Sequence, residues 1–503
     1  MRRRVNVEVG ASLNLVGALL KYLSLMFLFP IPLALGYSEP WWYYAASGAV
    51  TALVGWGLER GTKGKERVGI REGFLVVSLT WLLGSAAVAL SYVLSGEDQL
   101  SRPVDALFEA MSGLTTTGSS VVSDVSTLDK SLSMWRQFTQ WFGGMGIIVL
   151  ALAVLPRLRV GGRQLMESEA PGPELEALTA SIRDTARRLW LLYVVLTAIL
   201  VAILATFGWT GVDDRMSLFN ATAYAFAAMP TGGFGIDPRS LEGYAPASQW
   251  VLALFMAIAG ANFALLYRAF ARRKPVALAR DEEFRLYLGL LLLASAAITA
   301  IIWDAGISAG EEAIRQATFQ TVSIMTTTGF ASTDFNEWLV IAPAAAMLIV
   351  ALMFPGGSAG STAGSIKVVR HLVIGRVLRR ELDQAMHPEY VTPVRVNRVP
   401  IEERTVRAVI AFVLLYVGAF VAGAVLLLLD AHRVDLDLSP FDALAASATT
   451  LGNVGPAFGF AGPMGSFEPF SDVSIGIMTG LMWLGRLEIV PVVALLTRAY
   501  WRA

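Results

Sequence analysis

Four short turns rich in threonine and glycine recur along the chain, and their backbone oxygens could bind a cation. The turns read TTTGSS (115–120), PTGGFG (230–235), TTTGFA (326–331) and GNVGPA (452–457). Glycine gives the backbone access to positive φ values and keeps side chains out of a narrow path. A ring of backbone carbonyls can replace the hydration shell of an ion, as it does in potassium filters. The turns therefore predict a cation filter built from backbone rather than from side chains.

The segments before these turns align with one another without a gap. Counting back thirteen residues from Gly118, Gly233, Gly329 and Gly455 reaches Asp105, Asn220, Gln316 and Asp442, and an alanine follows each of them. About 11 helical residues span only some 16 Å, which is roughly half of the hydrocarbon layer. We predict four half-length helices that enter the membrane and stop at the turns. Asp105, Asn220 and Asp442 are suitable N-cap residues, and Gln316 is a weaker one.

The composition indicates a protein with many membrane crossings. Of 503 residues, 55% are apolar and 16% are charged, and the mean hydropathy is +0.57. Ten apolar runs are long enough to cross: 11–36, 40–58, 73–95, 134–156, 186–208, 247–268, 284–303, 338–354 with a continuation beyond a break to about 380, 405–429 and 472–497. A cleaved signal peptide is the alternative for the first run, although the run is long and Lys21 interrupts it.

The charges predict how the chain is oriented. Loops on one side carry 31 Lys and Arg residues, and loops on the other side carry seven, which are Arg102, Lys130, Arg136, Arg215, Arg239, Arg315 and Arg433. Basic loops face the cytoplasm, so both termini are predicted to be cytoplasmic. The formal net charge of zero conceals a basic inner face and an acidic outer face, and the acidic face would concentrate cations at a pore mouth. The absence of cysteine excludes disulfides and thiolate metal sites.

Three further motifs carry a family resemblance. QWFGGMGIIVLALAVLP (140–156), GGSAGSTAGSIK (356–367) and WLGRLEIVP (483–491), together with the turns, resemble the Trk/Ktr/HKT family of potassium transporters over essentially the whole chain. The two extra N-terminal crossings resemble the TrkH-like branch of pore subunits. The resemblance implies an all-α polytopic membrane protein. In this fold a unit of helix, re-entrant pore helix with filter loop, and helix is repeated four times around one central pore, and two extra N-terminal transmembrane helices are added.

The repeat and the resemblance divide the chain and assign its filter. The predicted divisions are residues 1–71 for the extra helix pair and 72–180, 181–280, 281–400 and 401–503 for the four pore repeats. The implied K⁺ filter consists of Thr116, Thr117, Gly118, Thr231, Gly232, Gly233, Thr327, Thr328, Gly329, Asn453, Val454 and Gly455, with K⁺ as the only bound metal. In plant members of the family, glycine at the position of Gly118 is associated with potassium permeation. The fourth turn departs most from the pattern.

Two elements are predicted to gate the path. The segment 355–365, PGGSAGSTAGS, could not easily continue a helix. The resemblance implies a flexible loop within the membrane, and a cytoplasmic linker is the alternative. Arg486 lies some 20 Å along the last crossing, where the resemblance implies a barrier beneath the filter; the alternative is that it reaches the interface or pairs with another helix. The implied gating residues are Gly356, Gly357, Ser358, Gly360, Ser361, Thr362, Gly364, Lys367 and Arg486.

The resemblance also implies a function and partners. The expected function is K⁺ uptake across the cytoplasmic (inner) membrane by a homodimer, with Na⁺ as the second ion to consider. A cytoplasmic ring of nucleotide-binding TrkA-like subunits would regulate it by docking near the basic segment 367–407, and no cofactor or nucleic acid would bind this chain. A coupled secondary cation transporter (K⁺/H⁺ or Na⁺) with a midplane site is the alternative, since such proteins also use broken helices. An enzyme is not supported, because His371, His387 and His432 lie in or beside loops.

Overall fold

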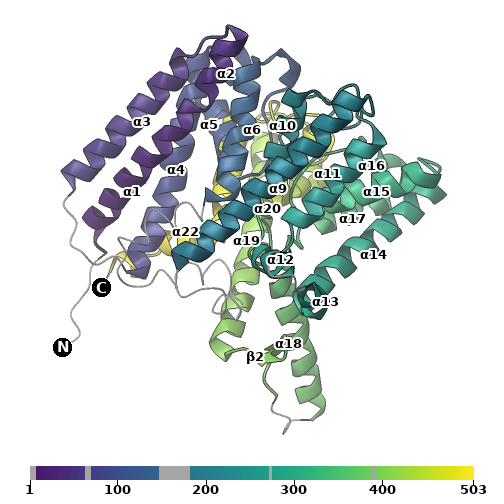
Figure 1. Cartoon of the computed structure of the whole chain (residues 1–503). Coiled ribbons are helices and arrows are strands. Elements are labelled where there is room, and N and C mark those ends of the chain that lie inside the picture. Colours follow the sequence, from purple (N-terminus) through teal and green to yellow (C-terminus); the bar gives the residue numbers. More distant parts are fainter. Residues whose placement is uncertain are drawn as a thin grey trace, which may run out of the picture.

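The protein is built from helices that run side by side, as a computed structural model shows for residues 7–62, 69–146, 182–270, 275–387, 389 and 392–502 (Figure 1). Within this part of the chain the only strands are β1 (Arg395–Val396) and β2 (Val399–Pro400), which form a short antiparallel hairpin. At the lower end of Figure 1, α18 (Val368–Met386) projects beyond the other helices, and the hairpin packs beside it. The predicted all-α fold is confirmed.

The first two predicted crossings correspond to a packed pair of helices. These are α1 (Val9–Leu23), continued by η1 (Ser24–Leu28) and α2 (Pro30–Tyr37), and α3 (Trp42–Gly61). Gly17 and Gly55 lie at the contact, where a Cβ added to Gly17 would come within 2.9 Å of Leu58 Cβ. Small residues of this kind let two membrane helices approach closely.

Each Thr/Gly turn follows a helix of 11–16 residues that lies between two other helices of its repeat. The helices before and after the turns are α4 (Ile70–Ser95), α5 (Pro103–Leu114) and α6 (Lys130–Gly144); α9 (Ile182–Thr210), α10 (Leu218–Ala228), α11 (Pro246–Ala259) and α12 (Phe263–Phe270); α14 (Glu282–Asp304), α15 (Gly310–Met325), α16 (Trp338–Ile341) and α17 (Pro343–Leu352); and α19 (Glu403–Arg433), α20 (Pro440–Gly452), α21 (Asp472–Arg486) and α22 (Val490–Leu496). The shorter connecting helices are η2 (Asp98–Leu100), η3 (Val125–Thr127), α13 (Val276–Arg280), η5 (Gly459–Ala461) and α23 (Arg498–Trp501). Residues 147–156 of the fourth expected crossing lie outside the described part. The exact domain divisions stay predictions.

None of the four predicted N-caps was correct, and three of them lie three residues after the observed cap. Ser217 and Ser439 cap α10 and α20, and their side chains accept from the backbone N–H groups of Asn220 and Asp442. Asn220 and Asp442 are therefore third helical residues, as Asp105 is in α5. The aspartates still suit this first turn, because a carboxylate interacts favourably with the positive end of the helix dipole. Gln316 lies inside α15, which begins at Gly310.

The number of continuous spans is smaller than the ten apolar runs. By length and composition, five helices of the described part could cross a membrane, or up to seven if two bent pairs each count as one span. The apolar runs at 247–268 and 472–497 are each divided between two helices, because α11 and α12 meet at 105° and α21 and α22 at 119°. At the second bend Glu488 and Ile489 have positive φ. Pro491 follows, and its ring does not fit the interior of a continuing helix.

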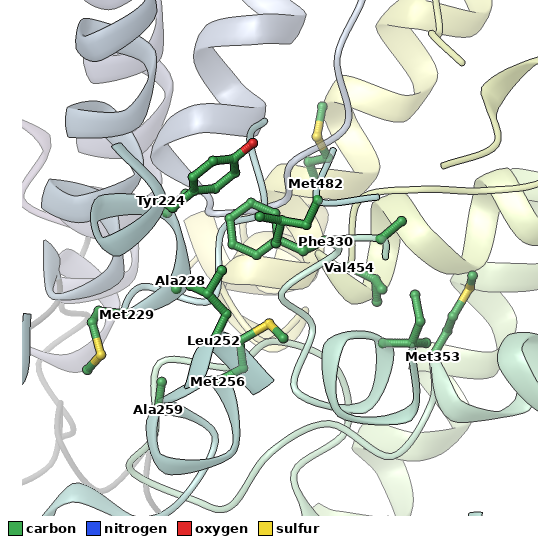
Figure 2. Close-up of a cluster of buried hydrophobic side chains, with 14 of the residues drawn as sticks. Tyr224, Ala228, Met229, Leu252, Met256, Ala259, Phe330, Met353, Val454 and Met482 are labelled. Carbon is green, nitrogen blue, oxygen red and sulfur yellow. The ribbon is translucent and has the colours of Figure 1, made fainter. Parts of the chain in front are cut away.

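The apolar core surrounds the ends of the short helices. Tyr224 of α10 packs edge-to-face against Phe330, with 5.5 Å between the ring centroids. Figure 2 shows these rings above Met256 of α11, and all three residues belong to one buried cluster that also contains Val454. The turns are thus held by well-packed side chains, which gives them a fixed backbone geometry.

Candidate functional site: a ring of four glycine turns

The four aligned glycines form a closed ring with carbonyl groups of the neighbouring turns. A Cβ built on each glycine would collide with one carbonyl oxygen: Gly118 with Gly232 O, Gly233 with Thr328 O, Gly329 with Val454 O, and Gly455 with Thr117 O, the last at 2.9 Å. The order runs from turn one to turn four and back to turn one. In every case the carbonyl belongs to the residue just before the aligned glycine of the next turn. The ring leaves no space for a side chain at these four positions.

All four turns share one backbone conformation. The residue two places before each glycine is left-handed, with φ of 55° at Thr116, 56° at Thr231, 58° at Thr327 and 54° at Asn453. The next amide then donates to the carbonyl five residues earlier, from Thr117 to Ser112, Gly232 to Ala227, Thr328 to Ser323 and Val454 to Thr449, over 2.8–2.9 Å. This pattern is a Schellman helix ending. The fourth turn therefore matches the other three in backbone geometry although its sequence differs.

Three of these left-handed residues are strained. Threonine is β-branched and rarely adopts positive φ, whereas asparagine tolerates it. Residues held in such conformations cost about 1–3 kcal/mol each and cluster at functional sites. The hydroxyls of Thr115 and Thr117 lie 2.7 Å apart, and those of Thr326 and Thr328 lie 2.8 Å apart. The carboxyl ends of four helices also meet here, so their negative dipole ends favour a cation.

Side chains tie one turn to another. Asn453 of the fourth turn donates from Nδ2 to Thr117 Oγ1 at 2.9 Å and to Met482 O at 3.0 Å. Ser119 Oγ donates to Gly455 O at 2.7 Å. Gln140 of α6 clamps the second turn, donating to Gly232 O at 2.6 Å and accepting from Phe234 N at 3.1 Å.

The glycine-rich segment lies against the inner ends of the turns. Thr362 Oγ1 donates to Met229 O at 3.2 Å, just before the second turn, and Gly364 N donates to Thr327 Oγ1 at 2.7 Å. A Cβ on Gly364 would clash with Gly452 O at the start of the fourth turn. The ends of the segment pair with each other, since Gly356 N donates to Ile366 O at 3.0 Å. Most residues of the segment are thus buried against the turns.

The remaining residues of the segment fasten it to the bend between α11 and α12. Ser358 N donates to Gly260 O at 2.8 Å, and a Cβ on Gly357 would lie 2.5 Å from the same oxygen. Gly360 has φ of 73° and accepts from Phe263 N at 3.1 Å. Ser361 N donates to Ser358 O at 3.2 Å, which tightens the turn of the segment. Lys367 Nζ donates to Ala363 O.

Arg486 ends α21 beside this segment. Its Nη1 donates to Thr362 O at 3.1 Å and its Nη2 to Gly143 O at 3.2 Å. Arg486 thus binds backbone carbonyls of the segment and of α6. Glu488, two residues later, forms an ion pair with Arg370 at the start of α18.

Sequence reasoning missed the buried ion pair between Glu109 and Arg136. Their side chains are 0% and 1% exposed, although Arg136 was predicted to be one of seven outer loop residues. The available signals were a glutamate in the middle of a short, mostly apolar helix and two glutamines, Gln137 and Gln140, near Arg136. The correction leaves the acidic excess of the outer face unchanged, because the two charges cancel. Within the described residues, no group of three or more His, Asp or Glu side chains could hold a metal ion.

Comparisons with known proteins agree with this architecture. Residues 44–501 match the family described as TrkH, cation transport protein. The chain is 36% identical over 444 residues to the Trk system potassium uptake protein TrkH of Escherichia coli (strain K12), covering 88% of each chain. It is 33% identical over 496 residues to TrkH of Halomonas elongata, covering 97% of this chain and 98% of the relative.

A solved structure agrees over the full length. The crystal structure of the potassium transporter TrkH from Vibrio parahaemolyticus matches with a TM-score of 0.84 and 31% sequence identity, covering 99% of this chain and 100% of that one. The matched family consists of transporters rather than enzymes. The chain therefore belongs to the TrkH family of cation transport proteins.

Proposed function

We propose that this chain is the pore-forming subunit of a potassium uptake system and that the ring of four turns is its K⁺ filter. The observation that carries the proposal is the closed ring, in which each aligned glycine faces a carbonyl oxygen of the next turn. Carbonyl oxygens at such close quarters can replace the hydration shell of K⁺. The relatives named above are potassium uptake proteins, which supports K⁺ as the substrate, with Na⁺ as the competing ion.

The glycine-rich segment 355–365 and Arg486 form the gate in this proposal. The segment contacts the second, third and fourth turns on their inner side. Arg486 adds a positive charge beside the segment, and a fixed cation impedes the passage of another. Movement of the segment away from the turns, together with Arg486, would open the path. Gly356, Gly357, Gly360 and Gly364 supply the conformational freedom for that movement.

The location and partners follow from the charges and the family. We place the chain in the cytoplasmic (inner) membrane with both termini in the cytoplasm, because its basic loops gather on one side. A homodimer and a nucleotide-binding, TrkA-like regulatory ring complete the proposed assembly. The projecting α18 and the β1–β2 hairpin belong to the basic segment on which the ring would dock (Figure 1).

Replacing Gly118 with serine tests the filter. A serine side chain there would collide with Gly232 O, so we expect the ratio of K⁺ to Na⁺ flux into vesicles to fall. Gly476→Ser in α21 is the matched control, because a Cβ at Gly476 meets nothing within 4 Å. An unchanged ratio in Gly118→Ser would remove this glycine from the filter. Expression in a bacterium without its own K⁺ uptake systems, followed by growth in low K⁺, tests the substrate.

Coupled secondary transport is the second candidate, and the two bent helix pairs favour it. Transporters often form a midplane site at interrupted helices, and α11–α12 and α21–α22 are interrupted in this way. Strict coupling of K⁺ uptake to proton or Na⁺ movement, with saturation at low K⁺, would support coupled transport. Ohmic single-channel currents would support the pore.

A further inference from the structure

We propose that Glu109 and Arg136 are positioning residues that set ion selectivity by holding the outer ends of the first and second filter turns. The inference rests on the proposed function, since it assumes that the turns form the filter. Neither residue belongs to a turn. The pair lies behind the filter, and it acts on the ion only through the backbone that it holds.

Glu109 binds the chain as it leaves the first turn. Its Oε2 accepts from Val121 N at 3.1 Å, and both carboxylate oxygens accept from Ser120 Oγ, at 3.0 and 3.1 Å. Ser120 lies two residues beyond Gly118, and its carbonyl accepts from Phe467 N at 2.8 Å. The carboxylate therefore fixes the exit of this turn with a charged acceptor, which forms stronger hydrogen bonds than a neutral one.

Arg136 connects the same carboxylate to the second turn. Its Nε and Nη2 donate to Glu109 Oε1 at 2.8 and 2.5 Å, and Nη2 also donates to Ser120 Oγ at 3.0 Å. The guanidinium lies over the ring of Phe234, with 4.3 Å from Cζ to the centroid. Phe234 follows Gly233 directly. One buried ion pair thus touches the residues just beyond two neighbouring filter glycines.

The other repeats use weaker contacts at the same position. The residue nine places before the aligned glycine is Glu109 in the first repeat and Tyr224, Gln320 and Ala446 in the others. Tyr224 donates to Ser240 O at 3.0 Å. With its side-chain amide oriented so that both O and N have partners, Gln320 accepts from Ser332 N at 2.9 Å. Ser332 lies twelve residues after Gln320, and Val121 likewise lies twelve residues after Glu109. Ala446 has no polar side chain, so the ionic version of this brace belongs to the first repeat.

At this aligned position the side chain thus varies among the repeats, from a glutamate in an ion pair to the methyl group of alanine. The variation indicates a positioning role in the first repeat rather than a general requirement of the fold. An alanine fits the fourth repeat, so the fold does not demand a brace at every turn. The charged brace instead makes the exits of the first two turns stiffer than the others. Selectivity depends on the geometry and field of the coordinating carbonyls, so loosening these two turns should alter the preference between K⁺ and Na⁺.

The test is the ratio of K⁺ to Na⁺ flux in vesicles containing full-length protein. Glu109→Gln keeps an acceptor for Val121 N but removes the charge. We expect the ratio to fall about tenfold, which corresponds to a difference of about 1.4 kcal/mol between the two ions. A double variant, Glu109→Leu with Arg136→Met, removes both charges. Replacing a buried pair by apolar residues often preserves stability, so its ratio should fall while its thermal unfolding stays near that of the parent.

Asp430→Asn is the matched control. Asp430 is also a buried carboxylate paired with an arginine, Arg433, and it accepts from Ser474 Oγ at 2.6 Å, but it lies at the end of α19 outside the filter ring. Its ratio should stay at the parent value. A parental ratio in Glu109→Gln and in the double variant, with a changed ratio in Gly118→Ser, would overturn the positioning role and leave the filter intact. A parental ratio in all of these variants would overturn both proposals.

Discussion

Arg486 and Thr362 join the two proposed gating elements directly, because Arg486 Nη1 donates to the carbonyl oxygen of Thr362 over 3.1 Å. Thr362 lies in the glycine-rich segment, and its own Oγ1 donates to Ala259 O at 3.2 Å. The other terminal nitrogen of Arg486 donates to Gly143 O, at the end of α6. One guanidinium therefore bridges the segment and a neighbouring helix, so the charge and the segment should move together.

Replacing Arg486 with alanine should increase K⁺ flux. The substitution removes a positive charge from the path and three donor contacts that hold the segment. Lowering a barrier by about 1.4 kcal/mol raises a rate about tenfold, and we expect an increase of that order. Rubidium uptake into proteoliposomes measures it. Arg486→Lys keeps the charge and should stay closer to the parent, and a parental flux in Arg486→Ala would contradict the barrier.

Glu283 should control how firmly the glycine-rich segment is held. Its Oε1 accepts from Ala359 N at 2.6 Å and from Val369 N at 3.2 Å, so it binds the segment and the start of α18 together. Glu283→Ala leaves two buried amides unpaired, at about 1–3 kcal/mol each. Hydrogen exchange of peptides covering 355–369 should become faster and basal flux should rise.

The matched substitution for Glu283 is glutamine, which keeps an acceptor oxygen. Glu283→Gln should therefore show a smaller increase in exchange than Glu283→Ala. A variant that is less stable overall but exchanges at the parental rate in 355–369 would argue that Glu283 supports α14 rather than the segment.

The sequence predicted the features that depend on local backbone chemistry. Glycine at four aligned positions follows from a backbone with positive φ and a carbonyl close by, so residue type alone marks the turns. The glycine-rich segment was recognisable for the same reason. The apolar runs indicated where the longer helices lie, because a helix needs about 20 apolar residues to cross the hydrocarbon layer.

The features that the sequence did not predict depend on contacts between distant residues. The bend at Gly260 lies where Tyr287 and Thr326 approach the helix, and neither lies nearby in sequence. The burial of Arg136 depends on Glu109, 27 residues earlier. The N-caps were misplaced because serine, aspartate and asparagine are all suitable cap residues, and only the backbone distinguishes the cap from the third helical position.

Substituting asparagine for Thr231 should stabilise the protein. Thr231 is left-handed at φ 56°, and the fourth turn already carries Asn453 in this conformation at φ 54°. Relief of the strain should raise the free energy of unfolding by about 1 kcal/mol, which thermal denaturation in detergent would detect. Thr222→Asn is the control, because Thr222 lies half-buried within α10, donates its hydroxyl to Leu218 O and has no left-handed strain to relieve. A lower melting temperature for Thr231→Asn would contradict the strain.

Arg370 and Glu488 should couple α18 to the gate. Their ion pair joins the first turn of α18 to the bend that follows Arg486, and their side chains are only 6% and 15% exposed. Arg370→Met and Glu488→Gln each release this link, so each should raise basal flux. The basal flux of the double variant should not exceed that of either single variant, because both substitutions break the same connection. Glu403→Gln, in the more exposed pair with Arg380 further along α18, should leave flux unchanged. Additive increases in the double variant would show that the two residues act independently, and α18 would then need another route to Arg486.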